Sequence, residues 1–253
     1  MTPDKILLEI CQEKDIITTS FCDNYVLKLA KNGQNHYLIG RHLGLNSAVS
    51  AALANDKSAT FAILSSKNIP AVPHYLYKNP ALFPDYKNPS LSRQSFPLVL
   101  KPNSNTHGGQ DVSLINTPAQ ATACIKNLFK VYDSLALSPF IDYPHEYRCF
   151  VLDGQVYLIY KKSRAANDFR FNLSRGATAR LIPEKDKLYA SLSALAIAAA
   201  SALDLRYASV DILDGKVLEL HSAPAARKLL RQLPTAAPLL RNFYRAALEQ
   251  LFS

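Results

Sequence analysis

The chain has 253 residues, 48% of them hydrophobic, which is enough for one large domain or two tightly joined lobes and excludes a disordered chain. Its formal net charge of +9 suits an anionic small ligand such as a nucleotide. We expect no nucleic-acid partner, because the Lys and Arg residues are spread along the chain without an arginine-rich arm or an aromatic RNA-binding signature.

Neither the N-terminus nor the most apolar stretch predicts secretion or membrane insertion. Residues 1–15 mix charges through an amphipathic pattern, unlike the apolar core of a secretory signal. The run "SLSALAIAAASALDL" is rich in small residues and is interrupted by serines, which is typical of a buried helix. The four cysteines form no CxxC pair. We therefore expect a cytoplasmic protein with reduced thiols and no membrane partner.

The first third of the chain predicts two helical regions separated by a hairpin. The first fifteen residues predict a helix, and "YVLKLAKNGQNHYLIG" gives two alternating runs around Asn32-Gly33, a strong hairpin signal. Apolar residues then recur at helical spacing over 46–68, where Asn55-Asp56 can start a second helix. The prolines of residues 78–97 predict a loop.

The remaining elements predict antiparallel sheet covered by helices. The strand "FPLVLKP" leads through the polar loop "NSNTHGGQDV" to the short strand "SLI", and Thr117-Pro118 opens a helix over 117–132. Two hairpins follow with the related turns "VLDGQV" and "ILDGKV". Helices over 184–203 and 236–252 should cover the resulting sheet, which gives an α+β fold class.

The last hairpin, "ASVDILDGKVLELH", carries an acid in each of its apolar strands. Buried carboxylates are costly unless they are paired or bind a metal. A two-residue turn at Asp214-Gly215 would put Asp211 and Glu219 on opposite faces. A three-residue loop with a G1 bulge at Gly215 would put them on one face, joined by His221, and we expect this second geometry. The alternative is an ordinary surface hairpin whose acids are solvated.

Two polar loops have the composition of anion-binding segments. The apolar strand "FPLVLKP" delivers Lys101 into a loop that contains Ser104, Thr106, Gly108 and Gly109, whose amides and hydroxyls can wrap phosphate oxygens. It is not a P-loop, because the lysine precedes the glycines. The segment "DFRFNLSRGATA" collects Arg170, Asn172, Arg175 and Gly176. Taken singly, a solvated edge lysine and a flexible surface loop explain these segments equally well.

The order of these segments resembles the ATP-grasp superfamily, and most closely the RimK-type amino-acid (glutamate) ligases. The series is "NDK", "LVLKP" before the glycine loop, "SPFIDYPHEYRCFV", "YKK", "DFRFNLSRGATA", "VDI" and "LELHSAP". The segment "DFRFNLSRG" is the most specific part. The stretch "NSAVSAALANDKSAT" is also similar to the ATP-grasp modules of cyanophycin synthetase and bifunctional glutathione synthetase. The resemblance covers roughly residues 45 to 226.

The resemblance implies an ATP-grasp fold, in which two α+β lobes with antiparallel sheets clamp ATP. Residues 1–55 would be a short N-terminal region of helix plus hairpin, 56–137 the N-terminal lobe with a glycine-containing lid loop, and 138–253 the C-terminal lobe with the metal site. The N-terminal region is shorter than the α/β domain that usually precedes such a core.

The resemblance also implies a role for individual residues. Catalytic roles would fall to Arg175, Asn172 and Lys161, and metal binding to Asp211, Glu219 and His221. ATP would be bound by Lys57, Lys101, the lid residues Ser104, Thr106, Gly108 and Gly109, the adenine-hinge residues Phe140 and Ile141, and Glu146 at the ribose. Where the family has a metal-binding Asn this chain has His221, which puts the second metal position in doubt.

The implied reaction is ATP-dependent ligation of a carboxylate to an amine through an acylphosphate, on an amino acid or peptide. The implied cofactors are ATP and Mg²⁺, with Mn²⁺ tolerated if His221 is a ligand. Two alternatives are another ATP-grasp reaction, phosphoryl transfer to a hydroxyl, and a nucleotide-binding module without catalysis. The apolar stretch 236–252 could form a homodimer helix, although packing on its own core is the use we favour.

Overall fold

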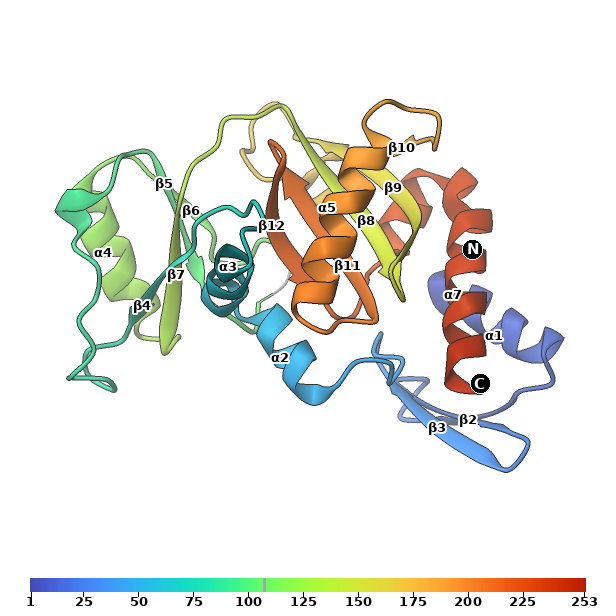
Figure 1. Ribbon diagram of the computed structural model, residues 1–253. Helices are drawn as coiled ribbons and strands as arrows, with labels where there is room; N and C mark the ends of the chain where they lie inside the picture. Colours follow the sequence, from blue (N-terminus) through green and yellow to red (C-terminus); the bar gives the residue numbers. More distant parts are fainter. Residues whose placement is uncertain (107) are drawn as a thin grey trace.

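The computed structural model describes residues 1–106 and 108–253, and its strands form three antiparallel sheets (Figure 1). The helices are α1 (Pro3–Glu13), α2 (Ala48–Asn55), α3 (Lys57–Ser66), α4 (Pro118–Leu128), α5 (Tyr189–Ala202), α6 (Arg227–Gln232) and α7 (Ala237–Leu251). The strands are β1 (Ile17–Phe21), β2 (Val26–Lys31), β3 (Gln34–Ile39), β4 (Tyr75–Lys78), β5 (Leu98–Pro102), β6 (Ser113–Ile115), β7 (Ser134–Pro139), β8 (His145–Leu152), β9 (Gln155–Ser163), β10 (Thr178–Ile182), β11 (Tyr207–Leu213) and β12 (Lys216–His221).

The N-terminal region consists of α1 and the small sheet β1-β2-β3. The predicted hairpin is confirmed: Lys31 pairs with Gln34, and both residues of the Asn32-Gly33 turn have positive φ. β1 was not predicted, because its polar sequence ITTSF has no buried face and all five residues are exposed. Leucines on the inner face of β2 and β3 join α1 and α7 in one core.

The predicted break between two helices at Asn55-Asp56 is also confirmed. The Asp56 carboxylate accepts a hydrogen bond from the Ala59 N–H at 2.8 Å and so caps α3. α3 packs against α5 and β12, and Leu64 belongs to the core beneath α5. The helix therefore packs with the C-terminal body, although it lies within the expected 56–137 lobe.

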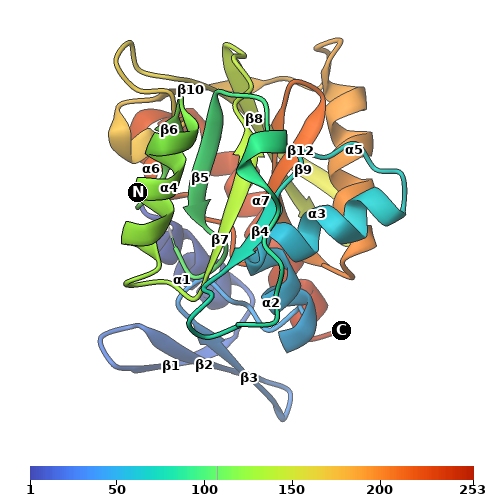
Figure 2. The same ribbon diagram turned by 90° about the vertical axis from the view of Figure 1, so that its left-hand side faces the viewer.

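The four-stranded sheet, called the smaller sheet below to distinguish it from the five-stranded one, has the strand order β4-β7-β5-β6 and is covered by α4. Figure 2 looks onto this sheet, with the larger sheet behind it. The predicted loop separates β4 from β5, and α4 begins at Pro118 with Thr117 as its cap, at 3.2 Å from the Gln120 N–H. The expected lid loop lies between β5 and β6, and its position 107 is outside the described residues.

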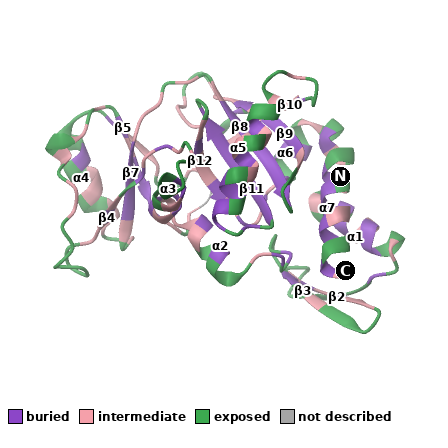
Figure 3. Cartoon of the chain, viewed as in Figure 1, coloured by how far each residue is buried: buried purple, intermediate pink, exposed green. Residues whose placement is uncertain are grey.

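The larger sheet has the order β10-β9-β8-β11-β12 and is the centre of the molecule (Figure 3). One face lies under α5, where alternate residues such as Cys149 and Val210 are fully buried. The other face is divided. Its far half packs on α7 through Phe150, Tyr160 and Tyr207, and Phe243 of α7 stacks on Tyr207 at 5.0 Å. Its near half, toward the smaller sheet, carries charged residues.

The turn of the β11–β12 hairpin differs from the expected one. Leu213 pairs with Lys216, so Asp214-Gly215 is a two-residue turn with positive φ at both residues, and the predicted G1 bulge was wrong. The register shifts inside the strand instead. Ile212 pairs with Val217 while Asp211 pairs with Glu219, so the extra residue is Leu218. This bulge brings both acids to one face, as the three-residue loop was expected to do.

The C-terminal helix is used for the protein's own core. The apolar side of α7, which includes Leu240, Phe243 and Leu248, is fully buried against α1 and the larger sheet. We therefore find no free apolar helix of the kind considered for a dimer contact at residues 236–252. Within the described ranges, every helix is too short or too polar to cross a membrane.

Candidate active site

The candidate site is a charged cluster on the near half of the larger sheet. Asp211 and Glu219 face each other across β11 and β12, and His221 lies two residues beyond Glu219 on the same face. One potential ligand atom from each of the three side chains lies within 4.8 Å of the others. The structure thus brings together the three residues predicted to bind metal, and it also surrounds them with cations.

Asp211 is the most enclosed of these residues. Arg148 of β8, its register partner, donates from Nε to Oδ1 at 2.6 Å and from Nη2 to Oδ2 at 2.5 Å. Lys162 Nζ donates to Oδ1 at 3.2 Å, and His221 Nε2 lies 3.2 Å from Oδ2. Only 5% of the Asp211 side chain is exposed. The buried acid of β11 therefore has protein cations as its partners.

Glu146 and Lys162 extend this cluster along the sheet. They are register partners on β8 and β9, both buried, and they form an ion pair. Burial raises the pKa of Glu146 to about 7 despite the Lys162 charge. Lys161, the residue expected at the nucleotide, pairs with Tyr147 and so faces the side of the sheet under α5. The lysine that the structure brings to the acids is Lys162.

Glu219 has a more open environment. Its Oε1 accepts from Lys101 Nζ at 2.7 Å, and 25% of its side chain is exposed. Among the described residues Oε2 accepts no hydrogen bond, and His221 Nε2 lies 3.9 Å from it. Lys57 contributes a second positive charge to this carboxylate. The Glu219 side of the site thus contains one acid and two lysines.

Asn103 fixes the two lysines relative to each other. It follows β5, the strand that ends next to Lys101, and its Oδ1 accepts both the N–H and the hydroxyl of Ser58 in α3. Its carbonyl accepts from Lys57 Nζ at 3.3 Å. Since Asn103 is fully buried, the start of α3 and the end of β5 are held together, and Lys57 and Lys101 approach Glu219 from these two elements.

The charge balance of the cluster controls its protonation. Burial alone would raise the pKa of both acids, but Arg148 and Lys162 outweigh it at Asp211, and Lys101 and Lys57 outweigh it at Glu219. Both carboxyl pKa values therefore lie well below their ordinary range. Burial lowers the pKa of Lys57, and Glu219 only partly offsets this. The acids are ionised at neutral pH.

A buried histidine borders the Glu219 side. His74 lies just before β4, and its Nδ1 is 2.9 Å from the Val72 carbonyl. Its Nε2 is buried without a hydrogen-bond partner among the described residues. Burial and the Lys101 charge hold its pKa well below the ordinary value, so the ring is neutral. With Nδ1–H donating to Val72, Nε2 is an acceptor beside the lysines.

The glycine loop contacts the segment 168–176. Arg170 Nη1 donates to the Gly109 carbonyl at 3.2 Å, and Arg175 donates to the carbonyls of Gly108 and Gly109 at 3.4 Å. Gly109 has φ +73°, and a Cβ there would lie 2.5 Å from Asn172 Oδ1. Only glycine allows this approach. The predicted lid therefore closes onto three of the predicted anion-binding side chains.

The residues expected at the adenine hinge, Phe140 and Ile141, lie in the connection between β7 and β8. Phe140 follows β7, its N–H donates to the Pro97 carbonyl at 3.0 Å, and its ring meets Phe169 edge-to-face at 6.1 Å. Ile141 is half-buried beside it. Ser104 and Thr106 are half-buried in the glycine loop, which is tied to α2 through Asn55 and Asn105.

Arg148, Lys162 and His74 were not predicted as site residues. The alternation in "HEYRCFV" puts Glu146 and Arg148 on one face of a strand, and this signal was present in the sequence. Side chains also alternate along β9, so once Lys162 is known to pair with Glu146, Lys162 lies on the face of the acids and Lys161 on the opposite face. No local pattern indicated His74, because its surroundings come from β5 and β12.

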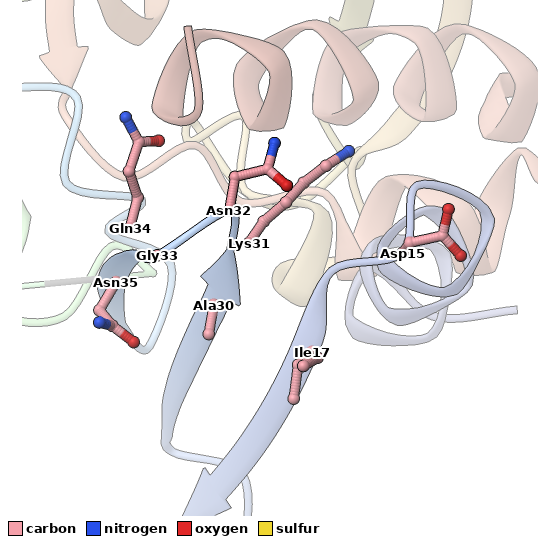
Figure 4. A pocket seen from close by; sticks show the side chains of 8 residues that line it. All are labelled: Asp15, Ile17, Ala30, Lys31, Asn32, Gly33, Gln34 and Asn35. Carbon is pink, nitrogen blue, oxygen red and sulfur yellow. The ribbon is translucent and has the colours of Figure 1, made fainter.

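Two hollows lie outside the charged cluster. One, of about 320 Å³, adjoins the β2–β3 turn (Figure 4) and is lined by Asp15, Ile17, Ala30, Lys31, Asn32, Gly33, Gln34 and Asn35. The other, of about 220 Å³, lies between residues 42–48, Ala51 and Ser222, just beyond the end of β12. Neither is lined by a predicted site residue.

The part of the chain that contains the candidate site is similar to known proteins. Residues 54–237 match a family model described as a RimK-like ATP-grasp domain. A probable alpha-L-glutamate ligase from Vibrio atlanticus is 30% identical over 187 residues, covering 71% of this chain and 59% of that relative. One from Coxiella burnetii, strain Dugway 5J108-111, is 30% identical over 186 residues with the same coverage. The chain thus spans about 59% of the length of these relatives.

Solved structures share the fold at lower identity. D-alanine–D-alanine ligase from Bacillus anthracis complexed with ATP matches with a TM-score of 0.63 and 21% identity, over 81% of this chain and 70% of that one. A bifunctional glutathione synthetase from Pasteurella multocida matches with a TM-score of 0.60 and 14% identity, over 100% of this chain and 44% of that one.

Proposed function

Because the chain belongs to the RimK-like ATP-grasp family and has the ATP-grasp fold, we propose that it is an ATP-dependent carboxylate–amine ligase that acts on an amino acid or peptide. The observation that carries this proposal is the pair of lysines at Glu219. Lys57 comes from the start of α3 and Lys101 from β5, and both contribute positive charge to this carboxylate. Two lysines converging from separate elements suit a polyphosphate.

The nucleotide would lie between the two larger sheets. Lys57 and Lys101 would neutralise phosphate oxygens, and the amides of the glycine loop would cover them. Phe140 and Ile141, packed by Phe169, would border the adenine at the hinge. Glu146 is buried in its pair with Lys162, so a role at the ribose would require that pair to open.

A divalent cation fits the Glu219 side of the cluster. Glu219 keeps Oε2 free of hydrogen bonds among the described residues, and Mg²⁺ prefers carboxylate oxygens together with phosphates and water. Mn²⁺ would also be accepted if the nitrogen of His221 takes part. When bound, the cation would offset charge on the phosphates. Asp211 fits less well, because its oxygens already bind Arg148 and Lys162.

The reaction consists of two displacements. A carboxylate oxygen of the substrate attacks the γ-phosphorus of ATP, which releases ADP and gives an acylphosphate. The amine then attacks the acyl carbon, phosphate leaves with the former carboxylate oxygen, and the amine loses a proton as the amide forms. Arg175 and Asn172 face the lid and would bind the transferring group, since charge develops on its oxygens. The closed loop would exclude water from the acylphosphate.

Product analysis tests this function. The purified chain, ATP and Mg²⁺ are incubated with panels of amino-acid carboxylates and amines, beginning with L-glutamate and peptides, because the relatives are named for glutamate. We expect ADP and phosphate in equal amounts, dependent on both substrates. Arg175→Ala should lose this turnover, whereas Arg180→Ala, at an exposed arginine of β10, should keep it.

Two outcomes would contradict the ligase proposal. Formation of ADP without free phosphate, and without any need for an amine, would indicate phosphoryl transfer to a hydroxyl. ATP binding without turnover on any pair would indicate a nucleotide-binding module. The departure of His221 from the family's Asn is the feature that keeps the second alternative in the test.

A further inference from the structure

We infer that Arg148 takes the place of one divalent ion, so that this chain binds a single metal ion, at Glu219. The inference rests on the proposed function, because it assumes that ATP is the ligand. It concerns the difference between two acids that the family resemblance treats alike. Its starting point is the number of hydrogen-bond donors around each carboxylate.

Donors occupy most of the acceptor positions of Asp211. An ionised carboxylate offers about four such positions. Arg148 fills two of them in a bidentate pair at 2.6 and 2.5 Å, Lys162 approaches a third at 3.2 Å, and His221 Nε2 lies 3.2 Å from Oδ2. Because Arg148 contacts both oxygens, a metal ion bound to either of them would lie against the guanidinium charge, so metal binding would require Arg148 to withdraw.

Withdrawal of Arg148 is opposed by its surroundings. Only 16% of its side chain is exposed, and it comes from the middle of a strand whose neighbours on both sides are paired. Removing one partner from a buried ion pair leaves an uncompensated charge, which is strongly unfavourable. The planar guanidinium also matches the carboxylate better than a lysine would. Arg148 is therefore a fixed cation.

His221 belongs to the same closed group. Its Nε2 lies 3.1 Å from Arg148 Nη2 and 3.2 Å from Asp211 Oδ2, whereas Glu219 Oε2 is 3.9 Å away. In either tautomer Nε2 is engaged with the Asp211–Arg148 pair. The residue that replaces the family's metal-binding Asn thus completes an ion-pair triad.

The balance of charges on the Asp211 side and on the Glu219 side also assigns the single metal ion to Glu219. On the Asp211 side two acids, Asp211 and Glu146, face two cations, Arg148 and Lys162. On the Glu219 side the lysines can turn to phosphates, which leaves Glu219 to a metal. Mg²⁺ is commonly held by one or two carboxylates plus phosphates and water, so one carboxylate is sufficient.

Counting bound metal tests the inference directly. The full chain is equilibrated with Mn²⁺ and the non-hydrolysable β,γ-imido analogue of ATP, and bound Mn²⁺ and nucleotide are measured by equilibrium dialysis. We expect one Mn²⁺ per bound nucleotide. Two Mn²⁺ would overturn the inference and leave the proposed ligase function intact. Nucleotide bound without any Mn²⁺ would contradict both.

Variants identify the residue responsible. Arg148→Met keeps much of the side-chain volume without the charge and frees Asp211, so the count should rise from one to two. Arg164→Met, which removes a half-buried arginine paired with the exposed Asp142, should leave the count at one. A count that stays at one in Arg148→Met would remove Arg148 from the explanation. If that variant does not fold, the count on the unaltered chain still decides between one ion and two.

Discussion

Asp211 and Glu219 are neighbours on one hairpin, yet they lie in opposite kinds of environment. The Asp211 side chain is 5% exposed and is contacted by Arg148, Lys162 and His221, whereas the Glu219 side chain is 25% exposed and, among the described residues, accepts a hydrogen bond from Lys101 alone. The Asp211–Arg148 pair lies within the larger sheet, whereas the Glu219–Lys101 pair joins that sheet to the smaller one. From this comparison we expect the Asp211 side to stabilise the fold and the Glu219 side to bind the proposed ligand.

The largest expected difference is in stability. In Asp211→Asn the new amide N–H₂ must face the donors of Arg148 or Lys162, so we expect a loss of about 3–5 kcal/mol in the free energy of unfolding. In Glu219→Gln the amide oxygen can still accept from Lys101 while N–H₂ points to the open side, so we expect about 1 kcal/mol. Urea denaturation measures both.

Asp142→Asn is the matched control for these variants, because it breaks an exposed pair with Arg164 and should change stability by under about 1 kcal/mol. Equal losses in Asp211→Asn and Glu219→Gln would mean that the two sides of the site are energetically alike.

The second expected effect concerns turnover on the ligand side. Arg175 is exposed, and among the described residues its guanidinium donates only to the Gly108 and Gly109 carbonyls, so Arg175→Ala should leave stability unchanged. If it binds the transferring phosphoryl group, kcat should fall about 10²–10³-fold with little change in KM for ATP. Steady-state kinetics make the measurement. A raised KM at normal kcat would assign Arg175 to ground-state binding.

The third effect concerns nucleotide affinity. If Lys101 binds a phosphate of ATP, Lys101→Ala removes a charge-assisted contact worth about 1.5–3 kcal/mol, so Kd for ATP should rise about 10- to 150-fold. Calorimetric titration would record it. Lys216→Ala, at an exposed lysine of the same hairpin, should bind ATP normally. Unchanged affinity for ATP in Lys101→Ala would show that Lys101, and with it the Glu219 side of the site, does not bind the phosphates.

The smallest effect is on the pH dependence of stability. The pKa of Glu219 is lower in the folded chain than its ordinary value, so its ion pair stabilises the protein above about pH 4.5 and this contribution is lost as the pH falls. Glu219→Gln should therefore lose less stability than the unaltered chain between pH 5 and pH 3. Thermal unfolding at several pH values tests this, and parallel curves would show that the pair contributes nothing.

The sequence predicted the elements of this site better than their partners. Turn residues and alternation located both hairpins and placed Asp211 and Glu219 on facing strands. The bulge at Leu218 was not predictable, because the run "VLEL" has no local sign of an extra residue. The partners Arg148 and Lys162 depend on the register between β8, β9 and β11, which pairs residues as distant in sequence as Arg148 and Asp211, 63 positions apart. The glycine loop was identified from the sequence, but its contact with Asn172 was not predictable, because it joins segments that are distant in sequence.

The most direct test of the ligase account follows oxygen rather than activity. A carboxylate substrate labelled with ¹⁸O is converted with ATP and an amine, and the inorganic phosphate is analysed by mass spectrometry. Transfer through an acylphosphate predicts one ¹⁸O atom in each phosphate released, since the carboxylate oxygen that attacks the γ-phosphorus leaves with it. Phosphate without the label would contradict the account.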